Sequence, residues 1–220
     1  MFSKLYSSKL YSKIITALKN VGLKKKKANL KLKEMLKIAH SLTTVVETRD
    51  PSTFEHGKRV QEYSLLIAQK LNVPQEMIKV ASVLHDIGKI GIPESILLKK
   101  DRLTHEEWEI IKQHPEIGQE LLKKQLLDFP EEVFDAIKHH HETLDGEGYP
   151  DSLEAEKLPL AIRILSVADA FEAMTSERIY RKIISQEEAL AELERCKGKK
   201  YDPLVVEALI SIIKEKNINP

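Results

Sequence analysis

The fold is decided by residues 74–93, which read PQEMIKVASVLHDIGKIGIP. Apolar residues recur here at the three- and four-residue steps of one helix face, at Met77, Ile78, Ala81 and Leu84. Proline is tolerated in the first turn of a helix, so Pro74 marks the expected start. Two glycines interrupt the pattern directly after His85 and Asp86. The stretch therefore predicts an apolar helix that ends by presenting a histidine and an aspartate.

The same helical rhythm continues through the rest of the chain. One apolar face is formed by Val60, Tyr63, Ile67 and Leu71. Signals for further helix starts are the capping-box pairs Thr104/Glu107 and Ser185/Glu188, Pro130, and Asp202–Pro203. No segment sustains the period-two alternation of a strand, so no sizeable sheet is expected. We therefore predict an all-α fold.

The composition is that of a soluble globular protein. Of the 220 residues, 42% are hydrophobic and 31% are charged, and the net charge is +1. The only cysteine is Cys196, which excludes an internal disulfide. No apolar run approaches the roughly 18 residues of a membrane-spanning helix, and the N-terminus lacks the pattern of a signal peptide. We expect a cytoplasmic protein.

The first thirty residues differ in charge from the remainder. They contain many lysines, and the first acidic residue of the chain is Glu34. Their apolar residues can line one side of a helix, so we expect residues 1–30 to form a basic amphipathic helical extension and residues 31–220 to form the main domain. Such a segment serves as a solvated extension or a dimer contact, or lies on an anionic membrane surface; a role in nucleic-acid binding is the remaining alternative.

The chemistry of the chain is concentrated in histidines near predicted helix ends and in two aspartates. His56 opens the helix of Val60, His114 is expected to close the helix after Trp108, and residues 139–141 are all histidine. An ionised aspartate with apolar neighbours, such as Asp169, needs a partner or a metal. A lone His-Asp pair such as His85–Asp86 is more often structural, but the whole set is hard to explain in that way.

Imidazole and carboxylate donors without thiolate are suited to iron, manganese or zinc. Seven candidate side chains are too many for one tetrahedral ion, and they suit two ions that share a bridging carboxylate. Two ions about 4 Å apart can hold both the attacking and the leaving oxygen of a phosphoryl displacement. The residue types therefore favour a two-metal phosphohydrolase.

The order of motifs resembles the HD-GYP branch of the HD phosphohydrolase superfamily, from about Glu47 to Pro203. The motifs that carry this resemblance are Glu47-x-Arg49-Asp50-Pro51, His56, His85-Asp86-x-Gly88-Lys89-x-Gly91-x-Pro93, His114-Pro115 with Gly118, His140-His141-Glu142, Asp145-Gly146-x-Gly148-Tyr149-Pro150, Arg163-Ile164-x-x-Val167-Ala168-Asp169, Ala173-Met174-Thr175-Ser176-x-Arg178 and Tyr201-Asp202-Pro203. The tripeptide Gly148-Tyr149-Pro150, in that setting, indicates the branch.

The resemblance implies an HD-domain helical bundle with a two-metal site at its centre. The metal ligands that it implies are His56, His85, Asp86, His114, His140, His141 and Asp169, with Asp86 as the bridging carboxylate. It assigns Lys89, together with Asp86, to catalysis, because Lys89 matches the lysine that reaches the scissile phosphate. Tyr149, Arg178 and Arg181 match positions that contact substrate, although a solvated helix face is the alternative for both arginines.

Other positions depart from the pattern or lie outside it. His139 is expected at the surface or behind the ligands, and His40 and His105 are expected to face solvent. Some relatives hold a third metal through an acid four residues before the first histidine, where this chain has Ser52. Glu172 stands where the family often has aspartate, so a hydrogen bond behind the ligands is expected to shift.

The resemblance implies an enzyme that hydrolyses cyclic di-GMP to pGpG, GMP or both, with two divalent ions, iron or manganese first. One alternative is a non-catalytic or dual-role module that contacts signalling proteins through Gly148-Tyr149-Pro150. Another is an enzyme for a different cyclic dinucleotide or nucleotide. A homodimer is plausible, and contact of the N-terminal helix with a membrane is an open alternative.

Overall fold

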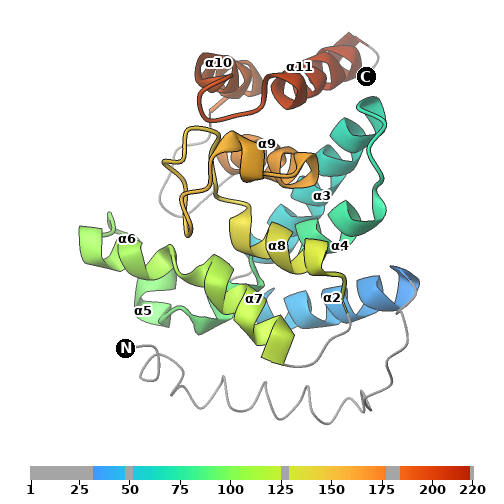
Figure 1. Cartoon of the computed structure of the whole chain (residues 1–220). Coiled ribbons are helices and arrows are strands. Elements are labelled where there is room, and N and C mark those ends of the chain that lie inside the picture. The colour runs from blue at the N-terminus through green and yellow to red at the C-terminus, as the bar shows by residue number, and fades with distance from the viewer. Residues whose placement is uncertain (1–31, 48–51, 125–128, 177–183, 219–220) are drawn as a thin grey trace.

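The computed structural model describes residues 32–47, 52–124, 129–176 and 184–218, and the regular elements among these residues are all helices (Figure 1). The elements are α2 (Leu32–Glu47), α3 (Ser52–Lys70), α4 (Glu76–Leu84), η2 (Ile87–Gly91), α5 (Glu94–Leu97), α6 (His105–Ile111), α7 (His114–Lys124), α8 (Glu131–His139), η3 (Ala155–Lys157), α9 (Leu160–Thr175), α10 (Gln186–Cys196) and α11 (Pro203–Ile218). Within these residues β pairing is limited to two isolated bridges, Asp145 with Glu154 and Lys197 with Tyr201. The expected all-α fold is confirmed.

Two large apolar cores hold most of the helices together, and a smaller cluster of Ile92, Ile96, Leu97 and Ile117 packs α5 against α7. One joins α3, α9, α10 and α11 through side chains such as Ile67, Phe171 and Leu209. The other joins α2, α4, α7 and α8 through side chains such as Leu121 and Ile137. Burial of such side chains contributes about 1.5–3 kcal/mol each relative to exposure. Figure 1 shows α9 to α11 in its upper part and α2 and α7 in its lower part, with α3, α4 and α8 between them.

Most helix starts lie where the sequence predicts them. Thr104 and Ser185 each form a reciprocal capping box with the glutamate three residues later. Asp202 Oδ1 accepts the backbone N–H of Leu204 at 2.8 Å, which confirms it as the N-cap of α11. The helix of the opening stretch begins at Glu76, two residues after Pro74.

The expectation that His114 closes the helix after Trp108 is wrong. That helix, α6, ends at Ile111, and His114 is the first residue of α7. The reason is Pro115, which has no N–H and is tolerated only in the first turn of a helix. The histidine therefore stands at a helix start, with the end of α6 directly before it.

The segment η2 packs against α7 by backbone contact. A Cβ atom added to Gly88 would lie 1.8 Å from the carbonyl oxygen of His114 and 2.5 Å from the backbone nitrogen of Gly118. Only glycine allows this approach. The contact brings the residues beside Gly88, including Asp86 and Lys89, close to His114.

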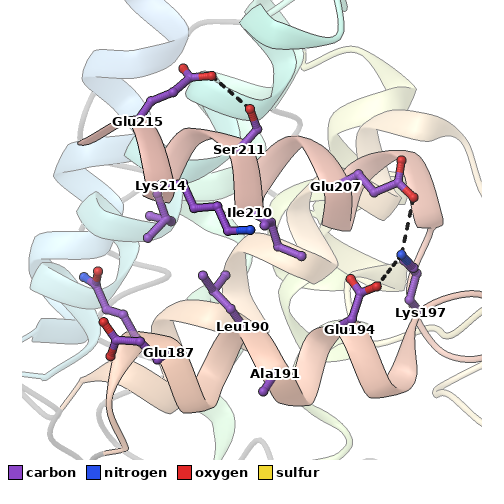
Figure 2. A pocket seen from close by; sticks show the side chains of 12 residues that line it. Glu187, Leu190, Ala191, Glu194, Lys197, Glu207, Ile210, Ser211, Lys214 and Glu215 are labelled. Atoms are coloured by element: carbon purple, nitrogen blue, oxygen red, sulfur yellow. Dashed lines mark hydrogen bonds and ion pairs between the residues drawn. The ribbon is translucent and has the colours of Figure 1, made fainter. Parts of the chain in front are cut away.

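A groove of about 770 Å³ lies between α10 and α11 (Figure 2). Its walls include Leu190 and Ile210, and at one end Lys197 pairs with Glu194 and Glu207. Among the described residues, no helix is long and apolar enough to cross a membrane. The expected N-terminal extension, residues 1–30, and its boundary with the main domain lie outside the described residues.

We predict that Gly88→Ala lowers the free energy of unfolding by about 3 kcal/mol, because the new methyl group must push two backbones apart. Gly57 provides the matched control. It lies in α3, where an added Cβ would approach nothing nearer than 3.9 Å, so Gly57→Ala should raise that free energy by about 0.5–1 kcal/mol. Urea unfolding monitored by circular dichroism measures both changes, and equal midpoints for the two variants would contradict the role of the contact.

Candidate metal centre

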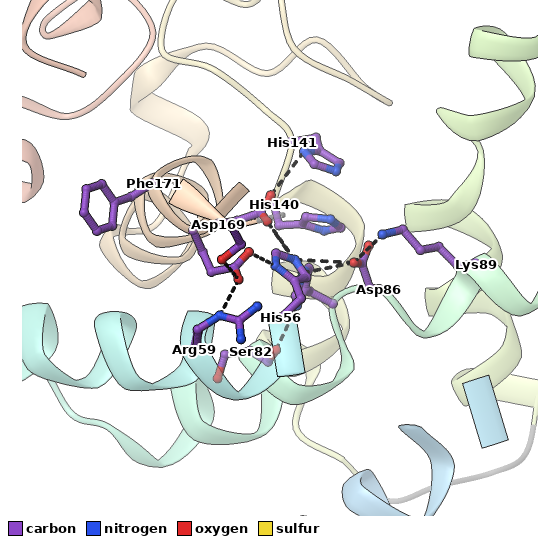
Figure 3. Close-up of polar contacts among 12 residues, drawn as sticks. His56, Arg59, Ser82, Asp86, Lys89, His140, His141, Asp169 and Phe171 are labelled. Atoms are coloured by element: carbon purple, nitrogen blue, oxygen red, sulfur yellow. Dashed lines mark hydrogen bonds and ion pairs between the residues drawn. The ribbon is translucent and has the colours of Figure 1, made fainter. Parts of the chain in front are cut away.

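Seven polar side chains converge between the two large cores, from α3, the end of α4, α7, the end of α8 and α9. Figure 3 shows His56, Asp86 and Asp169 within this centre. In each of two sets of three residues, the donor atoms of that set lie within 4.8 Å of one another. The first donor group is His56, His85 and Asp169, and the second donor group is His114, His140 and His141. A third combination, His85, Asp86 and His140, overlaps both. The structure therefore brings together every side chain that the sequence nominates as a metal ligand.

The first donor group is arranged around the Nε2 atom of His56. This atom lies 3.1 Å from Asp169 Oδ1 and 3.2 Å from His85 Nε2. Asp86 Oδ2 lies 3.5 Å from the Nε2 atoms of both His56 and His85. Two imidazole nitrogens and two carboxylate oxygens thus face one small space.

The second donor group lies on the other side of Asp86. His114 Nε2 is 3.3 Å from His140 Nε2 and 3.3 Å from Asp86 Oδ1. His141 Nδ1 is 3.8 Å from Asp169 Oδ2. The two oxygens of Asp86 therefore face different donor groups, which is the geometry that a bridging carboxylate needs.

The same kind of hydrogen bond to the backbone fixes the orientation of three histidines. The Nδ1 atoms of His85, His114 and His140 each lie 2.8 Å from the backbone carbonyl oxygen three residues earlier. A carbonyl can only accept, so Nδ1 carries the hydrogen and the lone pair of Nε2 points to the centre. This tautomer is the one that a ligand through Nε2 requires.

His56 is oriented by a side chain instead. Its Nδ1 donates to Glu172 Oε2, and the other oxygen of Glu172 accepts from Arg59 Nε at 2.6 Å and from Ser176 Oγ at 2.6 Å. Figure 3 shows Arg59 below His56 and Asp169. The departure at Glu172 thus lies directly behind a candidate ligand.

Burial keeps most of these histidines neutral. It lowers the pKa of His114 to about 3 and of His141 to about 4, and it holds the pKa of His140 well below its usual value. Burial would raise the pKa of Asp86, but Lys89 and the neighbouring histidines hold it well below the ordinary range. At neutral pH the centre therefore offers neutral imidazoles at His85, His114, His140 and His141 together with ionised carboxylates at Asp86 and Asp169, the forms that bind metals.

The loop that contains Gly148 and Tyr149 folds against the second donor group. Its anchor is Glu142, a buried residue whose carboxylate accepts the backbone N–H groups of Asp151 at 2.7 Å and Leu153 at 3.0 Å. The ring of Tyr149 lies 4.8 Å from the ring of His141, centroid to centroid. The loop therefore forms one wall beside the candidate metal site.

The remaining predicted residues are distributed as follows. Lys89 Nζ donates to Asp86 Oδ2 at 2.6 Å, and Tyr149 adjoins His141, whereas Arg178 and Arg181 lie outside the described residues. Outside the centre, the ring of His139 pairs with Asp151 at 3.0 Å, and His40 and His105 are exposed as expected.

Sequence reasoning missed two contributors to the site. Arg59 holds Glu172, and Lys112 places its Nζ 5.7 Å from the centroid of the Tyr149 ring. Arg59 could have been found from its spacing, because it stands three residues after His56 on the same helix face. Lys112 carries no comparable signal, since its contact crosses to a loop.

Comparison with known proteins agrees with the motifs. The sequence profile described as HD domain matches residues 40–205. The cyclic di-GMP phosphodiesterase of Thermotoga maritima is 42% identical over 185 residues, 83% of this chain and 50% of that protein. The cyclic di-GMP phosphodiesterase response regulator RpfG of Xanthomonas campestris pv. campestris is 40% identical over 172 residues, 77% of this chain and 46% of that protein. The chain thus spans about half the length of these relatives.

Two further proteins widen the comparison. The 3'3'-cGAMP-specific phosphodiesterase 2 of Vibrio cholerae is 36% identical over 200 residues, 87% of this chain and 38% of that protein. Bd1817, described as a HDG"Y"P protein from Bdellovibrio bacteriovorus, superposes with a TM-score of 0.64 at 21% identity, covering 83% of this chain and 62% of that chain. The latter likeness concerns the fold alone. The profile match extends over most of the chain, and the chain therefore belongs to the HD domain family.

Proposed function

We propose that this chain is a metal-dependent phosphodiesterase that hydrolyses a cyclic dinucleotide, with cyclic di-GMP as the first candidate. The observation that carries the proposal is the Asp86 carboxylate, whose two oxygens face two separate groups of donors. Such an arrangement is suited to two ions that share one carboxylate. Relatives named as cyclic di-GMP phosphodiesterases support the choice of substrate.

The donor chemistry fits two divalent ions, iron or manganese first. The first donor group with Asp86 Oδ2 would hold one ion, and the second donor group with Asp86 Oδ1 would hold the other. Neutral imidazoles and carboxylates without thiolate are the ligands that these metals accept. When bound, two such ions supply a Lewis acid and lower the pKa of a bound water.

The protein's own residues would bind and orient the phosphate. Lys89 is the cation nearest the shared carboxylate, and its side chain is 15% exposed, so its Nζ can also contact a phosphate oxygen and stabilise the charge that develops there. Tyr149 would form a wall for the substrate beside His141. We propose the same class of contact for Arg178 and Arg181, on the resemblance of their motif alone.

Hydrolysis of cyclic di-GMP would give pGpG, GMP or both. A relative named as specific for 3'3'-cGAMP makes that cyclic dinucleotide the second candidate substrate.

We also propose residues 1–30 as a basic extension of a domain spanning 31–220, in a cytoplasmic protein. Protein contacts through Gly148-Tyr149-Pro150, a homodimer, and contact of the extension with a membrane surface are subsidiary proposals.

We predict that Mn²⁺ or Fe²⁺ raises the midpoint of thermal unfolding, because the metal binds the folded chain only. At an ion concentration about 100 times the dissociation constant the gain is about 2.7 kcal/mol. His56→Ala, which removes a donor of the first donor group, should lose most of this gain, whereas His105→Ala, which alters an exposed histidine, should keep it. Differential scanning calorimetry with and without metal measures the effect, and equal gains in both variants would contradict the assignment.

We predict that Asp86→Ala abolishes turnover, because it removes the carboxylate that both donor groups share. Protein purified without oxygen and supplied with ferrous iron or manganese is incubated with cyclic di-GMP, and chromatography detects pGpG and GMP. Asp101→Ala, at an exposed aspartate, serves as the control. Full activity of Asp86→Ala would overturn the mechanism, whereas product from 3'3'-cGAMP alone would change the substrate.

We predict that Lys89→Met lowers kcat by roughly 10²–10³-fold, the effect of removing one donor that stabilises developing charge. Its metal content should be retained, because no ligand is lost and a neighbouring positive charge is removed. Lys100→Met, at an exposed lysine, is the matched control. Steady-state kinetics and elemental analysis test the two parts, and an unchanged kcat in Lys89→Met would remove Lys89 from the catalytic residues.

A further inference from the structure

We infer that Glu172 is a positioning residue for His56, and that it makes the first donor group the tighter of the two metal positions. The inference deepens the proposed function and rests on its two-ion site. It concerns the order and strength of metal binding, which the identity of the ligands alone does not give.

Glu172 and Asp169 act on the two nitrogens of one ring. They stand three residues apart on α9, so their side chains lie on the same face of that helix. Glu172 Oε2 accepts from His56 Nδ1, and Asp169 Oδ1 lies 3.1 Å from His56 Nε2. The imidazole of His56 is therefore fixed at both ends by carboxylates from one helix.

Glu172 is placed to act through His56 and not as a ligand itself. It is 1% exposed, and both of its oxygens have donors. Oε2 faces His56, while Oε1 accepts from Arg59 and Ser176, each at 2.6 Å. The positive charge of Arg59 also compensates the negative charge of Glu172. Glu172 therefore influences a bound ion mainly through its hydrogen bond to His56.

This hydrogen bond makes His56 a stronger donor than its neighbours. A carboxylate attracts the Nδ1 hydrogen more strongly than a neutral carbonyl does, which raises the electron density at Nε2. His85, His114 and His140 have only backbone carbonyls in that place. Among these four oriented histidines, His56 is thus the one with an anionic partner behind it.

Asp169 is also closer to the first donor group than to the second. Its Oδ1 lies 3.1 Å from His56 Nε2, whereas its Oδ2 lies 3.8 Å from His141 Nδ1. Each donor group in addition faces one oxygen of Asp86. A divalent ion is bound more tightly where negative donors approach it more closely. The first donor group should therefore fill first.

The test is a stepwise titration of the metal-free full chain with Mn²⁺, followed by calorimetry and by elemental analysis after dialysis. We expect two steps for the native protein, with one equivalent retained on dialysis. In Glu172→Gln the tight step should weaken roughly 10–100-fold, the usual effect of changing a group behind a ligand. The weaker step should not change. Neither readout depends on turnover.

Two controls separate positioning from folding. Ser176→Ala removes a hydrogen bond to Oε1 and leaves the contact with His56 in place, so both steps should stay native. Glu172→Asp keeps the charge but shortens the reach to His56, so it should weaken the tight step less than Glu172→Gln does. Circular dichroism of each metal-free variant checks that the helices are intact, and Glu172→Asp serves as the test where Glu172→Gln does not fold.

A further variant identifies the position that binds tightly. His114→Ala should abolish the weaker step and leave the tight one. The inference is overturned if His114→Ala removes the tight step, if Glu172→Gln binds as the native chain does, or if both steps weaken equally. A native chain that binds a single ion would overturn both the inference and the two-ion site, whereas failure to hydrolyse a cyclic dinucleotide would affect the proposed function alone.

Discussion

The rest of the structure depends on one buried anion, the carboxylate of Asp86. This residue is 4% exposed, and an ionised carboxylate is stable in such surroundings only with compensating partners. Lys89 supplies a positive charge at 2.6 Å, and His56, His85 and His114 lie within 3.5 Å of its oxygens. Each partner comes from a different turn or helix, so the compensation of one charge requires α3, α4, η2 and α7 to meet at one point.

Helix ends explain why the histidines are found there. The last turn of a helix leaves carbonyl groups without an intrahelical partner. Ser82, Ile111 and Ile137 lie in the last turns of α4, α6 and α8, and their carbonyls accept from the Nδ1 atoms of the histidines three residues later. One hydrogen bond thus satisfies a helix terminus and aims a donor at the centre. The carbonyl groups left without partners where these helices end therefore help to build the site.

The features that sequence predicts well here are local. Capping boxes, the N-cap at Asp202 and the donors beside helix ends all depend on residues within a few positions of one another. His114 is predicted to end the helix after Trp108 but begins the next helix, because Pro115 is tolerated only in the first turn of a helix. The bond from Glu172 to His56 joins residues 116 positions apart, so its existence could not follow from spacing. Glu172 differs from the aspartate that the family often has at this position, but its partner His56 is identified only by the packing of α9 against α3.

His56 differs from the other buried histidines of the centre in its response to positive charge. Burial would lower the pKa of His56, yet hydrogen bonds to Asp169 and Glu172 raise it above its ordinary value. At His85 and His114 burial prevails, and the pKa of His114 falls to about 3. A raised pKa means that the surroundings favour a positive charge, so the contrast between the pKa of His56 and that of the other histidines shows that the potential is most negative beside α9. The asymmetry arises from helix geometry, because a three-residue spacing on α9 places both acids on the face that meets α3.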